Sequence, residues 1–149
     1  MKKNVVLAAI LGVALSVSSV PLWAAKAEMT RAAQEDQAKE ALQALRQAYV
    51  DGDSEGFFKH VSWHSFFNTL ELKFQLSGHL RDFSQPDLHI VMDHAMVEND
   101  KVVLKTHWQK RAVRNSNGNV ENSQGQAQFV FKSREHGAKL IDIQGQNPF

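Results

Sequence analysis

Apolar residues in the first half of the chain recur with the period of an α-helix. Between about residues 30 and 50 they fall three or four positions apart, which places them on one stripe of a helix. Gly52 and Asp53 end this pattern, because glycine readily adopts left-handed backbone and aspartate caps a following helix. We therefore predict a long helix and then a short one. Their apolar positions are Ala38, Ala41, Leu42, Leu45, Ala48 and Tyr49 in the first, and Phe57, Phe58 and Val61 in the second.

A third helical pattern runs from Ser65 to about Phe83 and has a wide apolar face. Its apolar residues form two lines, one of Phe67, Leu70 and Phe74 and the other of Leu72, Leu76, Leu80 and Phe83. Gln85-Pro86-Asp87 then closes the helical half, because proline cannot continue a helix.

The period then changes to two, which is typical of β-strands. Residues 88–97 alternate in this way, and a second strand is predicted from residue 102 to about residue 114. Asn117-Gly118 is a strong hairpin signal, and the polar residues on both sides of it predict a protruding tip. Two further strands are predicted over residues 127–131 and 139–145, with the facing of the last one left open.

The register of the first hairpin follows from the need to keep one sheet face apolar. A three-residue loop over residues 99–101 separates an apolar face from a charged face, whereas a two-residue loop mixes them. This register sets His94 opposite Thr106 on the helix-covered face and Asp93 opposite His107 on the outer face. The other expected pairs are Met96–Leu104, Met92–Trp108 and Ile90–Lys110 on the first face, and Ala95–Lys105 and His89–Arg111 on the second.

Helices followed by antiparallel strands indicate the α+β fold class. We expect the N-terminal helices to pack on one face of a curved antiparallel sheet of about four strands.

Residues 1–27 are predicted to be a cleaved secretory signal peptide. Two lysines precede an apolar run over residues 5–17, and Ala25-Lys26-Ala27 offers small residues for cleavage before Glu28. The rest, residues 28–149, is then a single periplasmic or secreted domain with no membrane contact after cleavage. The chain has no cysteine, which excludes disulfides and thiolate chemistry.

Cleavage changes the charge balance of the protein. The signal carries Lys2, Lys3 and Lys26 and no acidic residue, so the mature chain has 14 basic against 16 acidic residues. A mildly acidic domain lacks the positive surface that nucleic-acid binding needs. We therefore exclude nucleic acid as a partner.

The order of these patterns resembles the NTF2-like superfamily, which has a cystatin-like cone of helices and curved sheet. The resemblance covers nearly all of the mature chain. It rests on runs of residue type at 45–53, 54–60, 81–83, 125–131 and 137–143, together with the long strand hairpin. It implies a pocket inside the cone, but the family includes isomerases, dehydratases, transport factors and accessory proteins, so the fold does not select a function.

Several histidines are candidates for metal binding or acid–base catalysis. His60 and His64 have the spacing of two metal ligands on one helix face, but no third ligand lies near them, so no metal and no cofactor is predicted. Asp93 and His107 would form a cross-strand ion pair on an exposed face. His94, among apolar neighbours, is the one candidate for a general base, and a core histidine bonded to Thr106 is its alternative.

The sequence predicts an exported protein that binds a small apolar ligand or a protein partner through the cone pocket, without catalysis. The alternative is a cofactor-free enzyme of the isomerase or dehydratase type that uses His94 as general base. A homodimer formed through the sheet is a further expectation. The predicted pocket residues are Tyr49, Trp63, His94, Thr106 and Trp108.

Overall fold

The structure, a computed structural model, describes residues 22–64 and 69–149, with side chains from residue 31 onward. Within these described residues three helices precede four strands, which confirms the predicted α+β class. The elements are α1 (Leu22–Asp51), α2 (Ser54–Lys59), α3 (Thr69–Asp82), β1 (Phe83–Glu98), β2 (Lys101–Arg114), β3 (Val120–Arg134) and β4 (Gly137–Gly145). Residues 65–68, where the third helix was expected to begin, lie outside the described residues.

The predicted stripe of α1 is the face that the helix buries. Leu45 and Tyr49 are fully buried, while Glu35 and Lys39 form an ion pair of 2.7 Å on another side. The helix ends as expected, because Gly52 takes a left-handed φ of 71°. Asp53 then caps α2 by accepting a hydrogen bond of 2.8 Å from the Gly56 amide.

Only one of the two apolar lines of α3 faces the core. Leu72 and Leu76 are buried, whereas Leu70 and Phe74 are 71% and 77% exposed. The wide apolar face predicted for this helix is therefore divided between core and surface.

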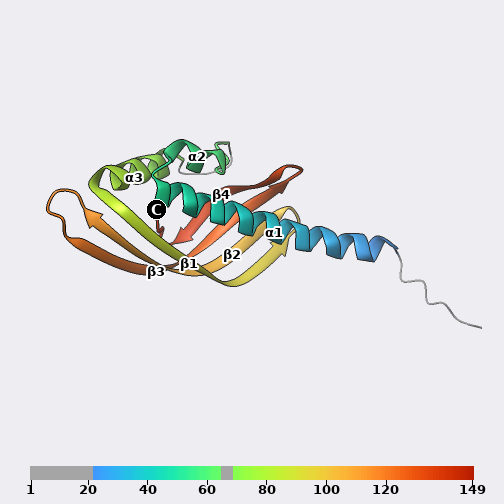
Figure 1. Ribbon diagram of the computed structural model, residues 1–149. Coiled ribbons are helices and arrows are strands. Elements are labelled where there is room, and N and C mark those ends of the chain that lie inside the picture. The colour runs from blue at the N-terminus through green and yellow to red at the C-terminus, as the bar shows by residue number, and fades with distance from the viewer. Residues whose placement is uncertain (1–21, 65–68) are drawn as a thin grey trace, which may run out of the picture.

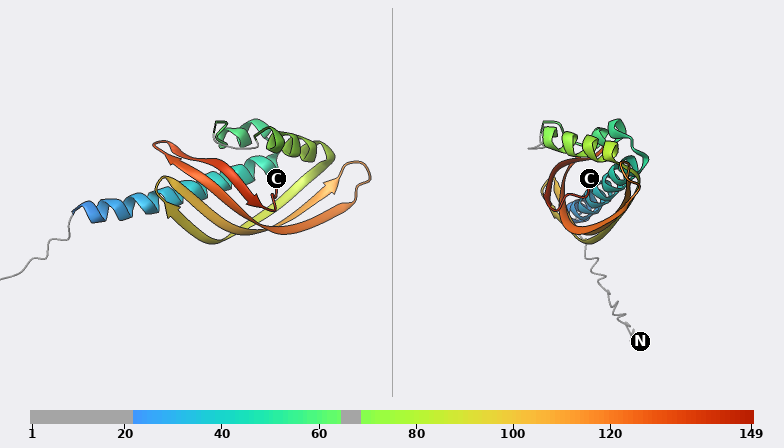
Figure 2. Two further views of the ribbon diagram at one scale, coloured as in Figure 1. Left: turned by 180° about the vertical axis from the view of Figure 1, so that it is seen from behind. Right: turned by 90° about the vertical axis from the view of Figure 1, so that its left-hand side faces the viewer.

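The four strands form one antiparallel sheet in the order β1-β2-β3-β4. The sheet is strongly curved and wraps around the second half of α1, with α2 and α3 lying across its open side (Figures 1 and 2). We call this enclosure of sheet and helices the cone. The segment after α2 closes it by pairing Val61 with Leu140 of β4 in a parallel bridge.

The predicted register of the first hairpin is wrong. Its turn has two residues, Asn99 and Asp100, with Glu98 paired to Lys101 and Asn99 at a φ of 56°. The pairing shifts by one residue between Met92 and His94, where Asp93 forms a β-bulge. Because a bulge reverses the alternation, the two-residue turn and an apolar inner face are compatible.

The bulge also decides which β1 residues face the helices. Ile90 and Met92 pair with inward-facing Trp108 and Thr106, and Ala95 pairs with inward-facing Leu104. His94 instead pairs with Lys105, and both are exposed on the outer face. The prediction that His94 faces inward, opposite Thr106, is therefore wrong. The expected pairs Met96–Leu104 and Ala95–Lys105 fail because the turn has two residues instead of three. The expected pairs Met92–Trp108, Ile90–Lys110 and His89–Arg111 fail because the bulge shifts the pairing by one further residue.

β3 begins earlier than predicted. Val120 already pairs with Val113, so the protruding tip is confined to the turn around Gly118, which has a φ of 71°. Residues 121–126 are polar on both faces, and no alternation of apolar residues marks them as a strand.

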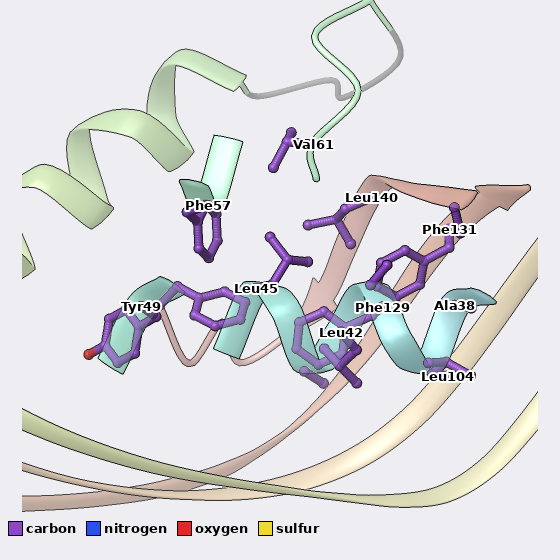
Figure 3. Packing of buried hydrophobic residues seen from close by; sticks show 14 of the residues in the cluster. Ala38, Leu42, Leu45, Tyr49, Phe57, Val61, Leu104, Phe129, Phe131 and Leu140 are labelled. Carbon is purple, nitrogen blue, oxygen red and sulfur yellow. The ribbon is translucent and has the colours of Figure 1, made fainter. Parts of the chain in front are cut away.

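The core lies between the stripe of α1 and the inner face of the sheet, with Phe57 of α2 added above it (Figure 3). Phe129, Phe131, Leu104 and Leu140 supply the sheet side and are fully buried. Leu140, rather than Ile141, faces inward, which resolves the facing of β4.

Most of the predicted signal peptide, residues 1–21, lies outside the described residues, so cleavage before Glu28 stays a prediction. Among the helices that the structure describes, none combines the length and apolar character needed to cross a membrane.

Candidate functional site

The chain passes into the cone after β4. Gly145 has a φ of 88°, and a Cβ there would lie 2.8 Å from the Gln126 carbonyl oxygen, so the turn requires glycine. The end of the printed sequence then lies inside the curve of the sheet (Figure 2, right). Pro148 and Phe149 are buried there.

Phe149 is surrounded by aromatic rings from three elements. Its ring centroid lies 4.8 Å from that of Phe57, 5.6 Å from that of Tyr49 and 5.9 Å from that of Phe129. Edge-on and tilted ring contacts of this kind add to the stability that burial gives. Phe149 therefore fills the space in which the sequence predicted a pocket. No periodic pattern includes this residue, so sequence reasoning missed it.

Polar side chains hold the same segment from the sheet and from α3. The Trp108 indole N–H donates to the Gln146 carbonyl, and the Lys110 ammonium donates to the Pro148 carbonyl, both at 2.8 Å. The Asn147 side-chain amide donates to Gln75 Oε1 at 3.1 Å.

Two buried polar atoms on neighbouring rings, one of which contacts Phe149, have no hydrogen-bond partner. They are the Tyr49 hydroxyl and Nε2 of His79, whose rings lie 5.5 Å apart. Burial raises the pKa of Tyr49, and burial, with the Lys110 charge adding to it, lowers the pKa of His79 to about 4. Burial also lowers the pKa of Lys110. At neutral pH the Tyr49 phenol is therefore protonated and His79 is uncharged.

Acid is expected to destabilise the protein through His79. Its folded-state pKa of about 4 lies below the ordinary value of 6.5, so between these values the unfolded chain binds more protons. The contribution of His79 to stability is complete above pH 6.5 and decreases as the pH falls toward 4. The loss is at most about 3 kcal/mol, because one pKa unit corresponds to about 1.4 kcal/mol.

Urea unfolding at pH 7 and pH 4.5 measures this loss. His79→Gln should reduce the difference between the two pH values, and an unchanged difference would contradict the assignment. His60→Gln is the control, because burial lowers the pKa of His60 too. This substitution should leave unchanged the loss of stability that comes from His79.

Three of the five predicted pocket residues lie in the cone and two do not. Tyr49, Thr106 and Trp108 are buried on its inner side, and the Thr106 hydroxyl donates to the Ala127 carbonyl at 3.0 Å. His94 is on the outer face. Trp63 is 49% exposed and lies against Phe58, with ring centroids 5.1 Å apart.

The surface of the cone is hollowed on one side, between α1 and β1. A groove of about 370 Å³ lies there. Its apolar lining comes from Leu42 of α1 and from Ile90, Met92 and Leu104 of the sheet, and Lys39 and Arg46 contribute two basic side chains. The Arg46 guanidinium is oriented by a hydrogen bond from Nε to the Leu88 carbonyl. Met92 is 38% exposed, so the apolar lining reaches solvent.

The outer face of the sheet carries the predicted ion pair. Nδ1 of His107 and a carboxylate oxygen of Asp93 are 2.6 Å apart, and both side chains are about half exposed. The bulge brings Asp93 to His107, although His107 pairs with Val91. An exposed pair of this kind contributes about 0–1 kcal/mol to stability. Among the described residues, no group of three or more candidate ligands that could hold a metal ion is found.

No family model and no curated protein sequence matches the chain. Solved structures do resemble it. A nuclear transport factor 2 (NTF2-like) superfamily protein from Salmonella enterica serovar Typhimurium LT2 is 16% identical, with 79% of this chain and 93% of that chain covered and a TM-score of 0.64. A ketosteroid isomerase-like protein from Erwinia carotovora atroseptica is 11% identical, with 77% of this chain and 98% of that chain covered and a TM-score of 0.62. An NTF2-like protein of unknown function from Shewanella oneidensis is 10% identical, with 75% of this chain and 98% of that chain covered and a TM-score of 0.56.

These likenesses establish the fold. The protein has the NTF2-like fold that the sequence patterns resembled.

Proposed function

We propose that the protein binds a small, mainly apolar ligand with an anionic group in the groove between α1 and β1, without catalysing a reaction on it. The observation that carries the proposal is the lining of this groove, which joins an apolar surface to two cations. Small-molecule sites typically combine a mainly apolar wall with a few polar groups that orient the ligand.

Each side of the groove supports a different part of the ligand. Leu42, Ile90 and Leu104 offer the alkyl surface against which an apolar chain or ring would be removed from water. Arg46 would take the anionic group, since its guanidinium is already oriented by the Leu88 carbonyl and can bind a carboxylate through two N–H groups. Lys39 is ion-paired with Glu35, so we assign it the lesser part.

The catalytic alternative named His94 as general base. That residue is exposed on the outer face of the sheet, away from the groove and from the interior of the cone. A general base must lie within hydrogen-bond reach of the proton that it removes, so His94 does not serve a ligand bound in either place.

Decanoate tests the proposal, with binding measured by calorimetry. Filling the groove with Ile90→Trp should weaken binding about tenfold or more, which corresponds to about 1.4 kcal/mol. Val120→Trp is the matched control, because Val120 is an exposed valine at the far end of the sheet and its substitution should leave binding unchanged.

The anionic group is tested separately. Arg46→Gln should weaken the binding of decanoate and leave that of decanol nearly unchanged, whereas Arg31→Gln, at an exposed position of the same helix, should affect neither. Equal binding of decanoate by the unaltered protein and Ile90→Trp would exclude this groove as the site.

A further inference from the structure

We infer that residues 147–149 act as a releasable plug, an internal occupant of the cone that competes with a ring-bearing ligand carrying a carboxylate or carbonyl group. This site is separate from the groove between α1 and β1, with which it shares no lining residue, and the inference does not depend on the proposed function.

Side chains, rather than the β-sheet ladder, hold residues 147–149 in place, as they would hold a ligand. β4 ends at Gly145, and beyond it only the Gln146 amide continues backbone pairing, to the Gln126 carbonyl at 2.9 Å. The other hydrogen bonds given for this segment each involve a side chain, that of Trp108, Lys110, Gln146 or Asn147. Removing residues 147–149 therefore breaks no bond of the β-sheet ladder.

Gly125 indicates that the adjoining wall is shaped around this segment. A Cβ at Gly125 would lie 2.4 Å from Oε1 of Gln146 and 2.7 Å from the Trp108 indole. A residue with a side chain would therefore push against the base of the plug and the residue that holds it. Glycine inside a strand commonly marks such a close approach.

The plug matches the apolar wall of the site and leaves two polar atoms at its other end without partners. Phe149 packs against Tyr49, Phe57 and Phe129, and Figure 3 shows Tyr49 and Phe57 near the end of α1. The Tyr49 hydroxyl and His79 Nε2 nevertheless have no hydrogen-bond partner. Buried polar groups are nearly always hydrogen-bonded, so these two atoms indicate an occupant with more polar atoms than Phe149 has.

Lys110 and Tyr49 indicate the chemistry of that occupant. The Lys110 ammonium lies 5.8 Å from the Tyr49 ring centroid, and its partner in the plug is a carbonyl oxygen, that of Pro148. Ammonium and phenol both donate hydrogen bonds, so the polar end of the site is complementary to an acceptor. A ring in the place of Phe149, joined to a carboxylate or carbonyl near Lys110 and Tyr49, would satisfy both.

The test uses the full chain with Phe149→Ala and the probe 3-phenylpropionate, which has the ring of phenylalanine and one carboxylate. The variant should bind the probe about tenfold or more tightly than the unaltered protein, because the internal competitor for the ring is gone. Phe74→Ala is the matched control: Phe74 is 77% exposed, and its truncation should leave probe binding unchanged.

Two additions separate the outcomes. Propylbenzene, which lacks the carboxylate, should bind Phe149→Ala more weakly than 3-phenylpropionate, and Lys110→Met in that background should remove the difference. Ile90→Trp should leave unchanged the gain in 3-phenylpropionate binding that Phe149→Ala produces, which distinguishes this site from the groove. If a folded Phe149→Ala protein binds the probe no better than the unaltered protein, or binds both probes equally, the inference is wrong.

The unaltered protein gives a test that does not depend on a variant folding. Excess 3-phenylpropionate should shift the NMR signal of the Asn147 side-chain amide as its bond to Gln75 is lost. If the Asn147 signal stays in place when the protein is saturated with the probe, the inference that the probe displaces the plug is wrong.

Discussion

Phe129→Ala should lower the free energy of unfolding by about 3–5 kcal/mol, the range for truncating a fully buried phenylalanine. Phe129 lies on the inner face of β3, has no exposed surface, and contacts the ring of Phe149. Truncation removes its apolar burial and leaves a cavity at a position where helices and sheet meet, so little collapse can compensate. Urea unfolding followed by circular dichroism measures the change.

Phe74→Ala is the control for this substitution. The same side chain is removed from a surface position that is 77% exposed, so the change should stay within about 0.5 kcal/mol. A loss at Phe129 as small as the loss at Phe74 would mean that the inner face of β3 is assigned wrongly.

Leu104→Ala should lower the free energy of unfolding by about 2–5 kcal/mol, as core leucine truncations do. Leu104 is fully buried on the inner face of β2, opposite Phe129 of β3 and Ala95 of β1. Its burial depends on the register of two hairpins, so the substitution tests how the sheet is paired as well as its packing. Leu70→Ala, at a position that is 71% exposed, is the matched control.

The two leucine variants separate two accounts of β2. If Leu104→Ala costs less than about 0.5 kcal/mol, as a surface substitution does, this strand faces the other way. The bulge at Asp93 would then have to be rejected along with the pairing of Ala95 to Leu104.

Local patterns predicted the helices and the ends of most elements well. The stripe of α1 has a helical period over several turns, and Gly52 and Asp53 have conformations that their residue types favour. Information of this kind lies within a few neighbouring residues. The division of α3 into buried Leu72 and exposed Phe74 was not predictable, because both lie on apolar lines and the neighbouring elements decide which line is covered.

The register of the first hairpin depends on one bulge, and this explains the error in the candidate site. Strict alternation along the strand favours a three-residue loop, because it places His94 on the same sheet face as Met92 and Met96. The bulge at Asp93 allows the shorter turn and moves His94 to the outer face. Thr106 and Trp108 were placed correctly because the alternation of β2 has no such interruption.

The plug was not predictable from periodicity either. Asn147, Pro148 and Phe149 follow the last strand and belong to no repeating pattern. Gly145 and Pro148 do signal that the chain turns after β4, but the aromatic space that receives Phe149 is formed by α1, α2 and β3 together. Only their packing shows that the predicted pocket is filled from within.

The central claim is that a small apolar anion binds between α1 and β1. The most direct measurement is a titration of isotope-labelled protein with decanoate, followed by NMR shifts of backbone amides and side-chain methyls. We expect the largest changes at Leu42, Ile90, Met92 and Leu104, with a saturable dependence on concentration. Saturable changes confined to another part of the protein, or none at concentrations where decanoate remains monomeric, would contradict the claim.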